Sequence, residues 1–333
     1  MMVETLEAAD RCIHSHNNTC MLMPNTPKAM LIKTLLSCIN LLTVTLNLLV
    51  VISISHFRHR HFFEMQLYTP TNLILLSLAV SDLLVGLTVM PLTIFSQQSC
   101  MFIDKITCTF SYLMSFILTS ASVGSMVLTS VDRYVAICYP LRYSSMVTTS
   151  RVKVCVSVCW FCSVVYNLIL LKEHLLQIDL SNSCYEECVV IINYITGAID
   201  LVLTFFSPVT VIIILYMRVF VVAVSQARVM RSQISALRSN TVTVKKSELR
   251  AARTIGIILL VFILSLCPYY SPSITGQDIT GSIDSMAQFW LFFCNSTFNP
   301  LIYAFFYPWF RKSVKLIVSL QILQPGSCEA KIM

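Results

Sequence analysis

The sequence predicts an all-α membrane protein, a seven-transmembrane helix bundle followed by a short cytoplasmic amphipathic helix. Hydrophobic residues make up 56% of the 333 residues, and charged residues make up only 12%. The mean hydropathy of +0.76 lies well outside the usual range of soluble domains. Seven stretches are apolar and long enough to cross a bilayer as helices of about 20 residues. In chain order they are 29–55, 71–97, 106–138, 152–171, 189–220, 252–273 and 285–307.

The basic residues indicate the orientation of these spans. An odd number of spans puts the two chain ends on opposite sides of the membrane. Of the 23 Lys and Arg residues, all but Arg11, Lys28, Lys33, Lys105 and Lys172 belong to one set of loops. The positive-inside rule makes that set cytoplasmic. We therefore expect a multi-pass plasma-membrane protein with an extracellular N-terminus, whose net charge of +7 reflects its cytoplasmic face and gives little support to nucleic-acid binding.

A single domain is the simplest organisation, because the chain has no internal repeat and no low-complexity segment. We expect 1–28 to be the extracellular N-terminus, 29–307 the transmembrane domain, and 308–333 the amphipathic helix and cytoplasmic tail. The longest cytoplasmic loop, 221–251, is polar and basic. We expect it to extend the fifth and sixth spans as helices; a solvated linker is the alternative.

The extracellular segments carry cysteines and a glycosylation sequon. Disulfides persist in the oxidising environment outside the cell. A bridge from the loop before the fifth span to the third span would fold that loop over the mouth of the bundle. Asn17 begins the sequon "NNT". The cysteines in or beside these segments are Cys12, Cys20, Cys108, Cys184 and Cys188.

Polar residues recur in the middle of several spans, where each is costly. One such residue could be structural glue, whereas a set that converges on one point indicates a hydrated ion site or a switch network. At the cytoplasmic end of the third span lies the ionic triplet "DRY", which is Asp132, Arg133 and Tyr134. The mid-span polar residues are Asn47, Asp82, Ser122, Asn295, Ser296 and Asn299.

One group of motifs covers every span: Asn47, "SLAVSD" with Asp82, Cys108, "DRY", Trp160, Pro208, Pro268 and "NPLIY" at 299–303. Together they resemble the rhodopsin-like G-protein-coupled receptors. More narrowly, "NSTFNPLIYAFFYPWF" from Asn295 to Phe310 resembles the fingerprint of the trace amine-associated receptors. The loop cysteines of "CYEEC" and the segment "VVISISHFRH…YTPTN" fit the same family.

This resemblance implies roles for several residues. Cys188 would pair with Cys108, and Cys184 with Cys20. Arg133 would pair with Asp132 and Glu248 at rest, then release to meet Tyr216 and Tyr303 when active, because a buried Arg must exchange one partner for another. Asn299 and Pro300 of "NPLIY" belong to the same switch, as does Tyr134. A sodium ion that favours the inactive state would be bound by Asp82, Ser122, Asn295 and Ser296, and no other cofactor is expected. A heterotrimeric G protein, the stimulatory olfactory type that raises cyclic AMP, would be the signalling partner.

Asp200 is a carboxylate in an otherwise apolar run, "ITGAIDLVLTFFSP". In most amine receptors of this class the ligand ammonium pairs with an aspartate in the third span, but that position here is Ser115, and no acid lies between Cys108 and Asp132. Asp200 lies roughly two helical turns before Pro208, at ligand depth. A mid-span charge costs about 2.5 to 3.5 kcal/mol, so it needs a partner. We expect that partner to be a ligand ammonium, as in fish members of the family that this chain resembles; a structural partner, hydration or protonation is the alternative.

Aromatic and hydroxyl side chains would complete the amine site. A cation over aromatic rings gains about 0.5 to 2 kcal/mol, although each aromatic taken alone more often packs in a core. We expect the ligand-binding set to be Asp200, Ser115, Thr119, Tyr112, Tyr269, Tyr270, Trp290 and Phe293.

The chain departs from the family pattern in two places. Leu266 stands where the family usually has a tryptophan, two residues before Pro268, so we expect activation to use Phe262 and Tyr269 instead. The first cytoplasmic loop is also longer than the family pattern.

Other classes of function find less support in the sequence. An enzyme is disfavoured because the chain has no nucleophile or metal-protease motif. A transporter or channel could use Asp82 and Asp200 as an ion path, but neither inverted repeats nor broken helices support it. Within the receptor class, the runner-up is a receptor for a non-amine ligand. Which amine binds, and whether mono- or diamines are preferred, is not encoded in any motif.

Overall fold

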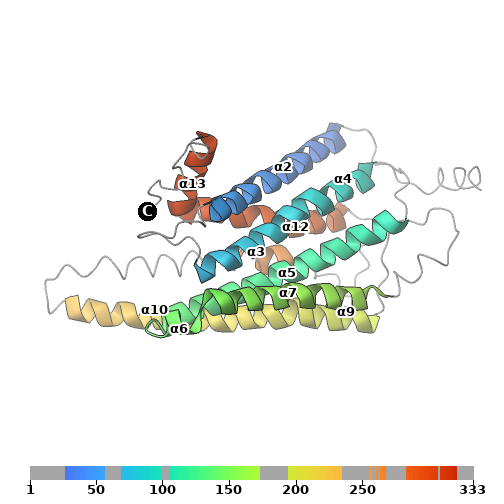
Figure 1. Ribbon diagram of the computed structural model, residues 1–333. Coiled ribbons are helices and arrows are strands. Elements are labelled where there is room, and N and C mark those ends of the chain that lie inside the picture. The colour runs from blue at the N-terminus through green and yellow to red at the C-terminus, as the bar shows by residue number, and fades with distance from the viewer. Residues whose placement is uncertain are drawn as a thin grey trace, which may run out of the picture.

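The computed structural model describes residues 27–56, 69–98, 105–172, 194–234, 256, 260–261, 263–267, 283–306 and 308–320. Within these residues the chain forms helices and contains no strand. The long helices run side by side as one bundle, and α13 (Pro308–Val318) lies across one end of it (Figure 1). The predicted all-α fold is confirmed.

The described spans follow the predicted order. Five helical segments among the described residues are long and apolar enough to cross a membrane: Met30–His56, Pro70–Phe95, Thr109–Cys138, Thr149–Leu170 and Ile195–Val222. The sixth span is described only in part. The elements are α2 (Pro27–His56), α3 (Pro70–Leu84), η2 (Val85–Val89), α4 (Met90–Gln98), α5 (Lys105–Cys138), α6 (Tyr143–Met146), α7 (Thr149–Leu170), α9 (Tyr194–Asp200), η3 (Leu201–Phe206), α10 (Ser207–Ile234) and α12 (Ile283–Phe306).

Local sequence accounts for where α3 and α7 begin. Thr69 caps α3, its hydroxyl accepting a hydrogen bond from the Asn72 amide, and Pro70 occupies the first turn, where a missing N–H costs nothing. Thr148 caps α7 in the same way by accepting from the Arg151 amide.

Two of the described spans contain π-helical segments, η2 and η3, each just before a proline. Pro91 and Pro208 lack an N–H, and their rings press on the preceding turn. A wider π turn relieves that clash and changes the rotation of the residues around it. Asp200 is the residue immediately before η3, so its direction depends on this widened turn.

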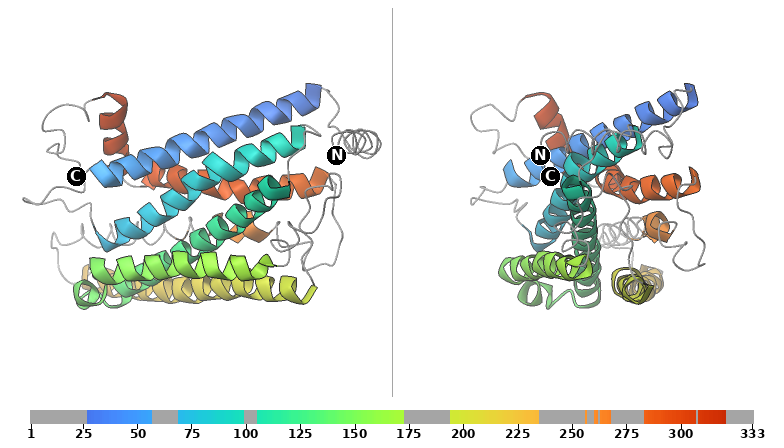
Figure 2. Two further views of the ribbon diagram at one scale, coloured as in Figure 1. Left: turned by 45° about the vertical axis from the view of Figure 1, so that its right-hand side comes forward. Right: turned by 90° about the vertical axis from the view of Figure 1, so that its right-hand side faces the viewer.

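The helix α5 crosses the middle of the bundle and packs against α3, α7 and α10 (Figure 2). Small residues allow close approach at the helix contacts, as is usual within membranes. A Cβ added at Gly124 of α5 would collide with the Cys159 side chain of α7, and one at Gly86 would lie 2.9 Å from Val44 Cγ2 of α2.

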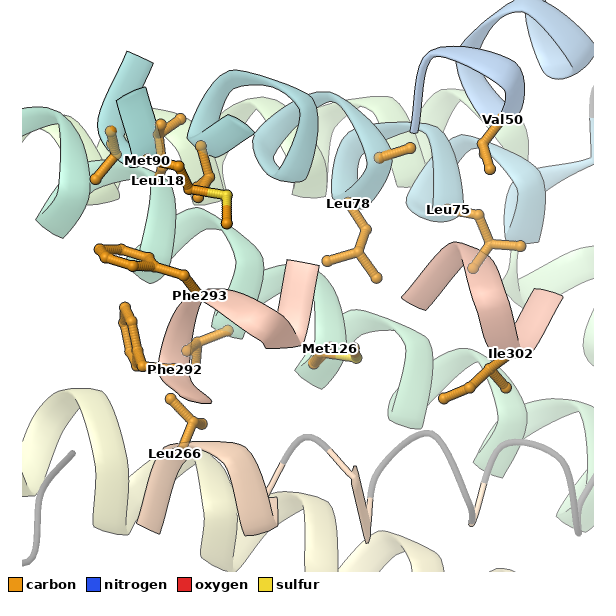
Figure 3. Packing of buried hydrophobic residues seen from close by; sticks show 14 of the residues in the cluster. Val50, Leu75, Leu78, Met90, Leu118, Met126, Leu266, Phe292, Phe293 and Ile302 are labelled. Carbon is orange, nitrogen blue, oxygen red and sulfur yellow. The ribbon is translucent and has the colours of Figure 1, made fainter. Parts of the chain in front are cut away.

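The interior of the bundle is a continuous apolar cluster. Figure 3 shows Leu266, Phe292 and Phe293 gathered in one part of this cluster, and Val50, Leu75 and Ile302 in another. The outward faces are also apolar: Leu41, for example, is 68% exposed and Phe161 69%. A helix that is apolar all round suits a lipid environment, because its backbone hydrogen bonds are satisfied internally.

Candidate functional site

Asp82 of α3 is held by two donors from α12. Its side chain is 1% exposed. The Ser296 hydroxyl donates to Oδ1 at 2.8 Å, and the Asn299 amide nitrogen Nδ2 donates to Oδ2 at 2.8 Å. Asn47 of α2 joins the same region by donating from Nδ2 to the Ser296 carbonyl oxygen at 2.9 Å. Both oxygens of this buried carboxylate therefore accept hydrogen bonds.

A small cavity lies between α5 and α12, with a volume of about 20 Å³. That volume is enough for about one water-sized occupant. Its polar lining includes Ser122, Asn295 and Ser296. Ser122 Oγ and Asn295 Oδ1 are buried and form no hydrogen bond with other described residues. The full lining is Val85, Leu118, Thr119, Ser122, Val123, Leu266, Phe292, Phe293, Asn295 and Ser296.

Ser296 connects the four residues of the expected sodium site, because it both donates to Asp82 and lines the cavity. Asp82 bonds to Ser296, and Ser122 and Asn295 line the cavity beside it. Hard cations prefer neutral and anionic oxygen ligands, which this set supplies. Two buried oxygens without a partner are consistent with a small cation binding here.

Leu266 occupies part of the cavity wall, where the family usually has a tryptophan. It is 2% exposed and lies near Phe292, which is also buried and lines the same cavity (Figure 3). Sequence reasoning missed Phe292, whose helical position alone does not distinguish it from any other core aromatic. The alternative switch residues Phe262 and Tyr269 lie outside the described residues.

Near the C-terminal end of α5, Asp132 is the centre of a second network. It is 2% exposed and pairs with Arg133, whose Nε donates to Oδ2 at 2.9 Å. The Thr71 hydroxyl donates to Oδ2 at 2.9 Å, and the Tyr143 hydroxyl donates to Oδ1 at 2.8 Å. Arg133 Nη2 also donates to Thr71. Asp132 thus joins the starts of α3 and α6 to the end of α5.

Thr71 and Tyr143 were not among the predicted site residues. Their approach to Asp132 depends on the short turn after α5, which brings Tyr143 at the start of α6 to within 3.3 Å of the Thr71 hydroxyl. No sequence motif predicts this contact. Burial raises the pKa of the Tyr143 phenol, so this hydroxyl remains a proton donor at physiological pH.

The remaining predicted switch residues are partly described. Tyr134 stacks edge-on against Tyr139, with ring centroids 5.9 Å apart. The Tyr216 ring of α10 lies directly against Gly256, where an added Cβ would collide with it. Asn299 binds Asp82 as described, and Pro300 is buried inside α12. Glu248 and the side chain of Tyr303 lie outside the described residues.

At the end of α9, Asp200 turns inward. It is 8% exposed, whereas its neighbours Ile199 and Val202 are 50% and 53% exposed. Tyr166 of α7 donates its hydroxyl to Asp200 Oδ1 at 2.8 Å. Among the described residues, no salt bridge involves Asp200, and the described hydrogen bond on its carboxylate is the one to Oδ1. The Thr204 hydroxyl also lies near the carboxylate, but its one hydrogen is donated to the Asp200 carbonyl oxygen at 2.7 Å. The carboxylate therefore has a neutral partner on one oxygen, a contact that sequence reasoning missed.

The other expected ligand residues are divided between α5 and α12. Tyr112, Ser115 and Thr119 are partly buried on α5, and Thr119 lines the cavity. Trp290 and Phe293 are buried on α12 and pack edge-to-face, with centroids 6.0 Å apart. Tyr269 and Tyr270 lie outside the described residues, as do Asn17, Cys20, Cys184, Cys188 and the side chain of Cys108.

Comparison with known proteins identifies the family. The model of the seven-transmembrane receptors of the rhodopsin family matches residues 46–303. Trace amine-associated receptor 13c of Danio rerio is 33% identical over 336 residues, covering 96% of this chain and 95% of that receptor. The chain belongs to the trace amine-associated receptors of the rhodopsin family.

Two further relatives of this receptor show the same extent of similarity. Trace amine-associated receptor 7e of Rattus norvegicus is 36% identical over 330 residues, covering 95% of this chain and 90% of that one. Trace amine-associated receptor 9 of Homo sapiens is 34% identical over 335 residues, covering 96% and 94%. The protein is therefore a multi-pass membrane receptor and not an enzyme.

Proposed function

We propose that this receptor detects amines and that Asp200 is the counter-ion of the ligand ammonium. The observation that carries this proposal is a carboxylate that faces the bundle at 8% exposure, with a neutral partner on Oδ1 and no described donor on Oδ2. A buried carboxylate in this condition gains most from a cation that brings its own hydrogen bonds. Relatives named trace amine-associated receptors support an amine as that cation.

The ligand's cationic head reaches Asp200 from the outer half of the bundle. Its apolar part lies toward the aromatic and hydroxyl side chains of α5 and α12. The aromatic rings of Trp290 and Phe293 attract a cation or pack against the ligand's alkyl chain. Because Ser115 carries no charge, the ammonium binds at the fifth span instead of the third.

A panel of mono- and diamines tests this proposal in cells that express the wild type or Asp200→Asn. Asparagine keeps the size of the side chain and removes its charge. We expect active amines to raise cyclic AMP in the wild type and to lose about a hundredfold or more in potency in the variant, since breaking a buried charge pair costs about 2 to 5 kcal/mol. An undiminished response in Asp200→Asn overturns the proposal and favours a non-amine mode of recognition.

Signalling is proposed to run through a heterotrimeric G protein of the stimulatory olfactory type, from a receptor in the plasma membrane with its N-terminus outside. The cyclic AMP response tests the G protein. A ligand-dependent current or ion flux without that response would favour the channel or transporter alternative.

A sodium ion is the second proposed ligand. The observation that favours it is the pair of unbonded buried oxygens, Ser122 Oγ and Asn295 Oδ1, beside the Asp82–Ser296 hydrogen bond. Asp82, Ser122, Asn295 and Ser296 would hold the ion, which would supply a positive charge that stabilises the resting arrangement.

A further inference from the structure

The rotation of α7 about its own axis points the Tyr166 hydroxyl at Asp200. The next residue, Asn167, is completely buried. Its Nδ2 donates to Ser120 Oγ of α5 at 3.0 Å and to the Ser163 carbonyl oxygen at 2.7 Å. Successive helical residues point about 100° apart. Fixing Asn167 against α5 therefore turns Tyr166 toward the fifth span.

A second contact, from the same span as Asp200, fixes the backbone of this residue. The Thr204 hydroxyl donates to the Asp200 carbonyl oxygen at 2.7 Å, across the first turn of η3. The backbone of Asp200 is thus tied to the widened turn while its Oδ1 accepts from Tyr166 at 2.8 Å. The carboxylate is oriented from two directions, and Oδ2 accepts no described hydrogen bond.

This geometry distinguishes two kinds of organic cation. A guanidinium is a planar fork that binds a carboxylate best through two parallel N–H groups, one to each oxygen. An ammonium is a compact charge that needs only one oxygen. Because Tyr166 already donates to Oδ1, a guanidinium would have to compete with the phenol for the lone pairs of that oxygen, which weakens its second hydrogen bond, whereas an ammonium can bind through Oδ2 alone.

We propose that Tyr166 is a specificity-determining residue of the Asp200 site, which by donating to Oδ1 weakens two-point binding of the carboxylate and thereby selects alkylammonium over alkylguanidinium ligands. This inference rests on the proposed role of Asp200 as the ligand counter-ion. Tyr166 acts through Asp200, so its effect is on the choice between ligand heads and not on signalling as such.

The test compares n-alkylamines with n-alkylguanidines of matched chain length, from propyl to octyl, on the full-length receptor. In the wild type we expect each active amine to be more potent than its guanidine partner. Tyr166→Phe removes only the hydroxyl and opens Oδ1. We expect the ratio of amine to guanidine potency to fall by about tenfold or more, which corresponds to one hydrogen bond to a charged group.

Three controls separate specificity from packing. Val165→Ala changes the neighbouring side chain, which is 37% exposed, and should keep the wild-type ratio. Tyr166→Met removes the hydroxyl with a flexible apolar side chain and should lower the ratio as Tyr166→Phe does, so that the test survives if one variant fails to reach the cell surface. Surface labelling with an epitope tag normalises each response.

The outcomes distinguish this inference from the proposed function. If Asp200→Asn abolishes amine responses but both Tyr166 variants keep the wild-type ratio, or if the wild type prefers guanidines, the inference about Tyr166 is wrong and the amine site stands. If Asp200→Asn responds like the wild type, or the wild type is silent to the whole series, the proposed function and this inference fall together.

Discussion

Asp82 and Asp200 are both buried carboxylates inside transmembrane helices, but their surroundings differ. Asp82 is 1% exposed, and each of its oxygens accepts a hydrogen bond from α12. Asp200 is 8% exposed, and only Oδ1 has a described donor, Tyr166. A fully bonded carboxylate ties helices together and adapts to a small ion, whereas a half-bonded one retains the capacity to bind something from outside.

The difference also lies in what surrounds each group. The partners of Asp82 come from the seventh span, next to a cavity of about 20 Å³ that suits a single small occupant. The partner of Asp200 comes from α7 at the edge of the bundle, and the expected aromatic residues lie on other helices. The same residue type thus forms an internal network at Asp82 and, in the function proposed above, a recognition site at Asp200.

The strongest way to break this comparison is to neutralise each carboxylate separately. Asp200→Asn should lower the potency of active amines by about a hundredfold or more. The same variant should keep the sodium effect of the wild type: the purified receptor should melt at a higher temperature in NaCl than in KCl at equal ionic strength. Asp82→Asn should abolish that sodium-dependent difference, because an ion that binds only the folded state stabilises it. Amine responses should persist in Asp82→Asn.

Melting curves in the two salts and amine dose–response curves on the three proteins make this check. If both variants lose the same property, the two sites are not separate, and the comparison fails. Ser122→Ala is the finer control, since it removes an unbonded oxygen without breaking a described hydrogen bond.

A smaller effect is expected from filling the cavity beside Asp82. Leu266→Trp inserts an indole where Phe292 and the cavity leave about 20 Å³. Overpacking a core costs about 1 to 3 kcal/mol, so we expect the receptor to melt a few degrees lower. Phe292→Ala in the same chain should recover part of the loss by making room for the indole.

Leu264→Trp is the matched control, because Leu264 lies on the same helix but is 58% exposed. Equal melting temperatures for Leu266→Trp and the wild type would show that the region is loosely packed. The packing of this region would then not explain why Leu266 replaces the tryptophan that is usual in the family.

The smallest effect concerns a third carboxylate, Asp132, whose oxygens are both bonded. Tyr143→Phe removes the donor to Oδ1 and makes Asp132 resemble Asp200. Asp132 then restrains Arg133 less firmly, and the loss of one such hydrogen bond is worth about 1 to 2 kcal/mol. We expect basal cyclic AMP, normalised to surface expression, to rise several-fold without a change in amine selectivity.

Ser145→Ala is the control for this variant, since Ser145 is an exposed residue of the same short helix α6 and its hydroxyl donates to the Arg142 carbonyl oxygen instead of Asp132. A basal signal that falls or stays level in Tyr143→Phe would mean that this hydroxyl does not stabilise the resting state.

The fold could be predicted from the sequence because each span needs only a long apolar run, and lipid leaves the backbone few alternatives to a helix. The predicted span 106–138, for example, lies within α5 (Lys105–Cys138). The π segments η2 and η3 could not be predicted, because a proline relieves its clash in several ways, and only packing selects one of them.

The candidate site could be predicted only as a list of residue types at suitable depths. Asp200 and Asp82 stand out because a charge within a span is costly. Tyr166, Thr71 and Phe292 do not, because a tyrosine, a threonine or a phenylalanine in or beside a span is ordinary. Which residues these side chains contact depends on how each helix is rotated in the bundle. For example, the hydrogen bond from Asn167 to α5 sets the rotation of α7 that points Tyr166 at Asp200, and the local sequence does not predict that contact.

Direct binding of the most potent amine to purified receptor tests the central claim with the fewest intervening steps. Equilibrium affinity is measured for the wild type and for Asp200→Asn in the same buffer, with melting curves to show that both are folded. We expect the substitution to weaken the affinity by about a hundredfold or more. Equal affinities in two folded proteins would contradict the account, because the charge of Asp200 would then contribute nothing to recognition.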